Sequence, residues 1–108
     1  MALNEALVSE FDEAMHGIYR RALKEAGYKA SIFLDMLYAH RGLETARRLI
    51  HSSKVSDGYT ALWERKRLDL TVEALIQENA KWHQLFSSEE LAICRKRLAQ
   101  YGYIGPNI

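Results

Sequence analysis

The sequence predicts an all-α protein, a compact bundle of about five to seven helices with a long N-terminal helix. Apolar residues recur every three or four positions in most segments, which is the spacing of one helix face. No segment shows the alternation typical of a strand, and a single proline occurs in 108 residues. The hydrophobic content of 48% is enough for a core, and the length suits one domain over residues 1–108.

The longest predicted helix covers residues 3–26 and is amphipathic. Its apolar stripe ends before Gly27, a residue that favours the left-handed end of a helix. A helix of this length spans the width of a small domain. We therefore expect part of it to pack against a second copy of the chain.

Shorter helices are predicted next. Residues 31–39 are apolar on nearly every side, which is typical of a helix surrounded by protein and indicates the centre of the core. Arg41 and Gly42 interrupt this pattern, and residues 43–51 predict another short helix. The turn-forming composition of residues 52–58 then predicts a loop.

The remaining helix boundaries are indicated by side chains that cap helix termini. These are Ser56 or Asp57 before a helix over residues 59–66, Asp69 or Thr71 before a helix that Asn79 closes, and a Ser87–Glu90 capping box before a last helix ending at Gly102. The apolar tail, residues 101–108, is expected to fold back on the core or to meet a partner.

Composition and charge favour a cytoplasmic protein. A net charge of +1 argues against coating nucleic acid or membrane by bulk electrostatics. The N-terminus lacks a signal-peptide pattern, and no apolar run approaches the ~18 residues of a membrane span. Cys94 is the single cysteine and has no partner for an internal disulfide, which fits a reducing compartment.

No arrangement of residues predicts catalysis, a metal or another cofactor. The four histidines match no zinc spacing, and Cys94 continues an apolar helical stripe, as buried free cysteines do. Glu13-Ala14-Met15-His16 is a single E-x-x-H fragment, whereas di-iron helical bundles use two. A metalloenzyme is thus only a third alternative, and we expect a non-enzyme.

Aromatic, charged and capping residues are densest at residues 56–73. Because Trp, Tyr and Arg carry much of the energy at protein contacts, this segment favours partner binding. The residues assigned to it are Tyr59, Trp63, Arg67, Asp69 and Glu73. In the architectural alternative, Trp63 fills core space and Arg67 pairs with Asp69 or Glu73. The preferred function is a helical interaction or regulatory module that binds a protein or itself.

The alternative function is a small nucleic-acid-binding protein. Four basic clusters lie near predicted helix C-termini, where the helix dipole and preceding acids favour them as solvated faces. A binding face would instead require two clusters to converge. Its residues would be Arg47, Arg48, Arg65, Lys66 and Arg67. Residues 43–67 are loosely compatible with a helix-turn-helix, although the loop is longer than its usual turn.

Several motifs resemble a family of small bacterial proteins of unassigned function. They are Phe33-x-x-Met36, Gly58-Tyr59-x-x-Leu62-Trp63, Arg67-Leu68-Asp69-Leu70-Thr71-x-Glu73 and Leu85-Phe86-x-x-Glu89-Glu90-Leu91. The resemblance covers about residues 28–103 and implies a self-contained helical module, with no activity to transfer. The family has a Gly-Gly pair where this chain has Arg41-Gly42, a difference expected to change only a helix entry.

Overall fold

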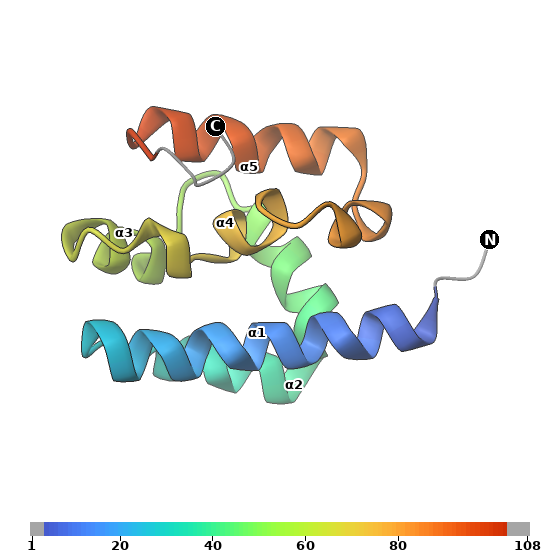
Figure 1. Cartoon of the computed structure of the whole chain (residues 1–108), viewed down its shortest axis with the longest axis horizontal. Coiled ribbons are helices and arrows are strands. Elements are labelled where there is room, and N and C mark those ends of the chain that lie inside the picture. The colour runs from blue at the N-terminus through green and yellow to red at the C-terminus, as the bar shows by residue number, and fades with distance from the viewer. Residues whose placement is uncertain (1–3, 104–108) are drawn as a thin grey trace.

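The computed structural model describes residues 4–103, which form helices and connecting loops without a β-strand (Figure 1). Five are α-helices and two are 3₁₀ helices, so the predicted all-α bundle is confirmed. Their bounds are α1 (Glu5–Ala26), α2 (Ser31–Ile50), α3 (Asp57–Glu64), η1 (Leu68–Leu70), α4 (Val72–Gln77), η2 (Ala80–Leu85) and α5 (Ser88–Gln100). Within residues 4–103, no helix is both long and apolar enough to cross a membrane.

Helix α1 is the predicted long N-terminal helix and follows the longest axis of the molecule (Figure 1). The Asn4 side chain caps it by accepting hydrogen bonds from two amides of the first turn. Gly27 ends it with a φ of 65°, as the sequence predicted. The predicted first residue of this helix, residue 3, lies outside the described residues. The buried stripe of α1 consists of Leu7, Phe11, Met15, Ile18 and Ala22.

Helix α2 is kinked at Arg41, whose φ of 65° and ψ of 177° are not helical. The interruption predicted at Arg41-Gly42 is therefore real. Beyond the kink, the Gly42 amide donates a hydrogen bond of 2.7 Å to the Asp12 carboxylate on α1. A Cβ at position 42 would lie 2.8 Å from the Asp12 Cα atom, so α1 and α2 can cross here only at a glycine.

The first half of α2, residues 31–40, is not the centre of the core, and that prediction was wrong. It lies along the outer side of α1 (Figure 1), and Leu37 is its only buried residue. Ile32 and Tyr38 are 75% and 76% exposed. The physical reason is the kink, because only the second half of α2 turns away from α1 toward α5.

The main core lies where α1, α2, α4, η2 and α5 meet, and the first half of α2 contributes one buried residue to it, Leu37. Phe11 occupies its middle and packs edge to face on Trp82 and Phe86. Cys94 is fully buried in the same core. The stripe of apolar residues predicted for α1 therefore meets the α5 stripe through these aromatic rings.

Most predicted helix caps are present, with two corrections. The confirmed caps are Ser56 at α3, Thr71 at α4 and the Ser87–Glu90 capping box at α5. Asp69 does not cap α4, because it lies inside η1 and its carboxylate binds Arg67. Asn79 does not close α4 but caps η2, where its side chain accepts from the Lys81 amide.

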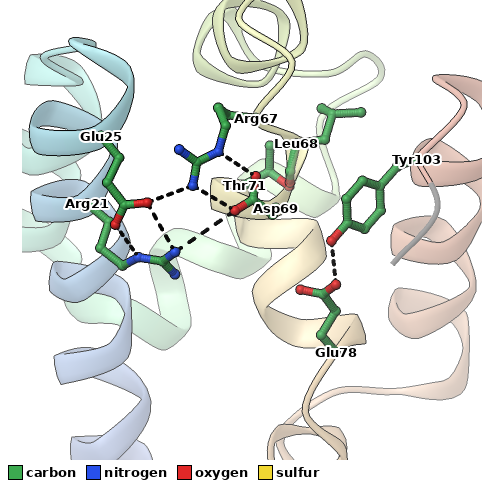
Figure 2. Close-up of polar contacts among 8 residues, drawn as sticks. All are labelled: Arg21, Glu25, Arg67, Leu68, Asp69, Thr71, Glu78 and Tyr103. Carbon is green, nitrogen blue, oxygen red and sulfur yellow. Dashed lines mark hydrogen bonds and ion pairs between the residues drawn. The ribbon is translucent and has the colours of Figure 1, made fainter. Parts of the chain in front are cut away.

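The end of the described chain folds back on the core. The Tyr103 hydroxyl donates a hydrogen bond to the Glu78 carboxylate at the end of α4 (Figure 2). Burial and this neighbouring acid raise the pKa of Tyr103. The rest of the predicted tail, residues 104–108, lies outside the described residues.

Gly42→Ala is expected to lower the free energy of unfolding by about 1–3 kcal/mol, because its methyl group overpacks the crossing of α1 and α2. Gly17→Ala is the matched control, since the nearest atom to its new Cβ lies 4.0 Å away. Alanine favours a helix over glycine, so this control should gain up to about 1 kcal/mol. Urea unfolding followed by circular dichroism measures both, and equal effects would contradict the close approach at Gly42.

Arg41→Gly is expected to raise the free energy of unfolding by about 1 kcal/mol. Arg41 occupies a backbone region that is essentially reserved for glycine, which costs roughly 1–3 kcal/mol for another residue. The greater freedom of an unfolded glycine offsets part of the gain. Arg41→Ala distinguishes the effect of the backbone conformation from that of the arginine side chain. It removes the side chain but keeps the backbone strain, so it should not raise the free energy of unfolding. A stabilised Arg41→Ala and an unchanged Arg41→Gly would contradict the prediction.

Candidate functional site: an exposed helix face and a cavity

The residues assigned to partner binding are divided between interior and surface. Tyr59 and Glu73 are only 2% and 4% exposed, whereas Trp63 is 45% exposed. The Trp63 ring rests edge to face on Tyr101, with 5.5 Å between ring centroids. The remaining two of the five residues, Arg67 and Asp69, are half-buried. A partner at the surface can therefore contact three of the five.

Arg67 and Asp69 belong to an ion-pair cluster that joins the end of α1 to η1 (Figure 2). Arg67 donates hydrogen bonds of 3.0 Å to both carboxylate oxygens of Asp69 and one of 2.7 Å to Glu25. Arg21 donates to Glu25 at 2.9 Å and lies 4.0 Å from Asp69. The predicted pairing of Arg67 with Asp69 is confirmed, which makes the architectural interpretation of Arg67 sound.

The charges of this cluster stabilise one another. Hydrogen bonds from Arg21 and then Arg67 lower the pKa of Glu25 from its usual 4.5 to about 2. The same contacts, with Asp69 first, raise the pKa of Arg67. Two cations thus face two carboxylates, and this part of the surface has little unpaired charge to offer a ligand.

Glu73 forms a buried ion pair with Arg97, which the sequence analysis did not single out. Arg97 donates to Glu73 at 3.0 Å, and also to the carbonyl oxygens of Leu49 at 3.1 Å and Ser52 at 2.6 Å. Burial raises the pKa of Glu73, and the Arg97 guanidinium opposes that rise. The sequence carried one signal, since Arg97 lies three residues after buried Cys94 and so faces the same side of α5.

The five residues of the alternative nucleic-acid face are not gathered by their contacts into one surface. Arg47 donates to the Leu85 carbonyl at 2.9 Å, at the end of η2. Arg67, which follows α3 in the sequence, binds residues of α1 and η1 instead. Helices η2 and α3 lie toward opposite ends of the longest axis of the molecule (Figure 1). Of the other three residues, Arg48 forms an ion pair with Glu44 and Arg65 stacks over the Tyr28 ring. Lys66 is exposed to solvent.

The residues considered for catalysis have ordinary surroundings. Glu13 pairs with Arg20, and the His16 ring contacts Tyr38 edge to face. Cys94 is fully buried, and burial raises the pKa of its thiol to about 12. Within residues 4–103, no three or more His, Cys, Asp or Glu side chains are grouped so that they could hold a metal ion.

The first half of α2 presents an apolar surface that sequence reasoning had assigned to the core. Ile32, Asp35 and Tyr38 follow one another at intervals of three residues and therefore share one side of the helix. We call these three residues the outer face of α2. Asp35 makes no ion pair within residues 4–103, so its carboxylate stands alone between two large apolar side chains.

The inner side of the same half-helix borders a cavity of about 440 Å³ between α1, α3 and residues 70–73. Its apolar wall includes Ile18, Ala22, Phe33, Met36, Leu62 and Leu70. Tyr59 and Glu73 also line it, and the buried Tyr59 hydroxyl has no hydrogen-bond partner within the described residues. Sequence reasoning missed the cavity, because the spacing of apolar residues indicates which helix faces are apolar but not how closely those faces pack against one another.

Glu25→Gln is expected to destabilise the protein at neutral pH and to lose this effect in acid. The folded state keeps Glu25 charged at pH values where the unfolded chain protonates it, since its pKa falls from 4.5 to about 2. Its stabilising effect is therefore complete above about pH 4.5 and declines as the pH falls toward about 2. Melting temperatures across this range should converge for the wild type and the variant.

Glu44→Gln is the matched control for this prediction, because it removes an exposed ion pair with Arg48. Such pairs contribute little, so its melting temperature should stay near that of the wild type at each pH. A difference between Glu25→Gln and the wild type that keeps the same size down to about pH 2 would contradict the role of the cluster.

Comparison of the chain with known proteins gave no match among protein-family models, curated proteins or solved structures. The resemblance to a small bacterial family therefore stays a prediction.

Proposed function

We propose that this chain is a non-catalytic interaction module that binds a protein partner through the outer face of α2. One observation carries the proposal: Ile32 and Tyr38 are each about three-quarters exposed on a helix that is apolar almost all round. Exposed large apolar groups that cluster on one surface are characteristic of interaction sites. Tyrosine in particular is enriched at the energetic centres of protein interfaces.

The outer face of α2 suits the partner better than α1, which we first expected to form a homodimer. Most charged groups of α1 pair within the chain, as Arg20 does with Glu13 and Glu10 with Lys81. A surface already satisfied in this way gains little from a second copy. The two most exposed large hydrophobic residues of the part described, Ile32 and Tyr38, instead lie on α2.

Asp35 indicates the chemistry of the partner. An antiparallel pair of α2 helices centred on Asp35 would set Ile32 against Tyr38 of a second copy, but it would also bring two Asp35 carboxylates together. Like charges placed face to face disfavour association. The partner that fits is therefore a different protein, whose helix presents apolar side chains around a lysine or arginine.

The proposed setting is the bacterial cytoplasm. An unpaired buried Cys94 supports a reducing compartment, and the resemblance to small bacterial proteins supports the source. The module would act by contact alone, as a regulatory or assembly component, without a reaction of its own.

Photo-crosslinking in the host tests this proposal. With p-benzoylphenylalanine in place of Tyr38, we expect a cross-link to one protein other than this chain. Asp35→Lys in the same chain should reduce its yield about tenfold or more, because it sets a cation against the partner's cation. Position 23 is the matched control, since Leu23 is also exposed, at 44%, but lies on α1.

Three results would overturn the proposal. Equal cross-linking from positions 38 and 23 would show that the outer face has no special partner. Cross-links to a second copy would establish a homodimer instead. Loss of the cross-links after nuclease treatment, with binding that falls steeply with salt, would favour the nucleic-acid alternative and its Arg47, Arg48, Arg65, Lys66 and Arg67.

A further inference from the structure

We propose that the cavity between α1, α2 and α3 binds an apolar α-amino acid, with its side chain inside and its two charged groups at the opening. Three features support this ligand: the apolar wall of the cavity, one unpaired cation with one unpaired acid at the opening, and free amides at the start of α2. The charged residues, Lys29 and Asp57, do not belong to the outer face of α2. Ligand binding can therefore be tested separately from partner binding.

The cavity has the dimensions of a ligand site and not of a packing defect. Pockets for small molecules measure about 300–1,000 Å³, whereas voids in protein interiors are few and seldom larger than a water molecule. This cavity, of about 440 Å³, lies near the lower end of that range, and its wall is mainly aliphatic and aromatic. The part of a ligand that fills it is therefore small and apolar.

The opening lies where α2 and α3 begin. Lys29 and Asp57 border the cavity and are exposed to solvent, whereas Ala22 on the inner wall is buried. The loop before α2 and the start of α3 lie side by side here, because a Cβ at Gly58 would be 3.6 Å from the hydroxyl oxygen of Tyr28. Lys29 and Asp57 are the chain neighbours of these two residues, so they flank one opening.

The charges at the opening fit a ligand that carries both signs. Neither Lys29 nor Asp57 makes an ion pair within residues 4–103. An anion would be attracted by Lys29 and repelled by Asp57, and a cation would experience the reverse. A zwitterion satisfies both, with its carboxylate next to the lysine and its ammonium next to the aspartate. Glu73, the other charged residue of the wall, is already paired with Arg97 at 3.0 Å.

The start of α2 favours the same orientation. Ala30 precedes this helix and supplies no capping side chain. The amides of Ile32 and Phe33, which both line the cavity, make no hydrogen bond to another residue of the part described. Free amides at a helix start attract an anion. The carboxylate of the ligand therefore belongs beside Lys29, and its ammonium beside Asp57.

Calorimetric titration with L-tryptophan tests the proposal. Two related probes share its indole group: indole-3-propionate lacks the ammonium, and tryptamine lacks the carboxylate. We expect one molecule of L-tryptophan to bind per chain, about two- to fivefold more tightly than either related probe. This difference is the effect of one exposed ion pair.

Two charge variants should affect the probes in a crossed pattern. Lys29→Met keeps the aliphatic stem, and it should weaken L-tryptophan and indole-3-propionate about two- to fivefold without weakening tryptamine. Asp57→Asn should weaken L-tryptophan and tryptamine by a similar factor without weakening indole-3-propionate. Lys54→Met and Glu64→Gln are the matched controls, because they remove exposed charges outside the cavity lining and should leave all three affinities unchanged.

Two further variants locate the bound probe. Met36→Trp adds bulk to the cavity wall and should abolish binding. Leu34→Trp makes a comparable change on the same helix at a residue outside the cavity lining, so it should leave binding intact. Circular dichroism establishes that both variants fold, and if Met36→Trp does not, the charge variants decide the question alone.

The absence of saturable L-tryptophan binding would overturn the proposal. Binding of indole-3-propionate or tryptamine as tightly as L-tryptophan would also overturn it. If Lys29→Met and Asp57→Asn each weakened all three probes equally, these residues would act on the shape of the opening and not on the charges of the ligand. That result would equally refute a site for a zwitterion.

Discussion

The crossing of α1 and α2 at Gly42 is the constraint on which the rest of the structure depends. The missing side chain lets the two backbones approach, and the Asp12 carboxylate then accepts the Gly42 amide hydrogen. The kink at Arg41 interrupts the helical hydrogen bonds, but the buried Thr45 hydroxyl donates to the Met36 carbonyl at 3.0 Å across it. This hydrogen bond links the two halves of α2 across the kink.

Arginines from two of the four basic clusters connect segments of the fold. Arg67 closes the junction of α1 and η1 by binding Glu25 and Asp69. Arg97 closes the end of α2 by binding the carbonyl of Leu49 in its last turn and that of Ser52 just beyond it, as well as Glu73. Both guanidinium groups act as connectors between segments distant in sequence, a use that suits their several fixed donors.

Interactions between residues close in sequence were predicted well, whereas interactions between residues distant in sequence were missed. Ser87 and Glu90 satisfy each other's backbone amides within one turn, so their capping box was predictable. Arg67 and Asp69 were predictable as a pair because a single residue separates them, but Glu25, which also binds Arg67, is distant in sequence. Arg41-Gly42 was predicted to interrupt the helical pattern, but the sequence did not show that Arg41 would take a strained backbone conformation at a kink.

The all-round apolar character of residues 31–40 was taken as a sign of the core, yet only Leu37 is buried there. The kink leaves that apolar surface divided between the outer face of α2 and the wall of the cavity. Ile32 borders the cavity and is also exposed, and a substitution there changes both. Tyr38 is on the outer face, where its ring also contacts His16 of α1, and it does not line the cavity. A substitution at Tyr38 therefore tests the outer face of α2 without altering the cavity wall.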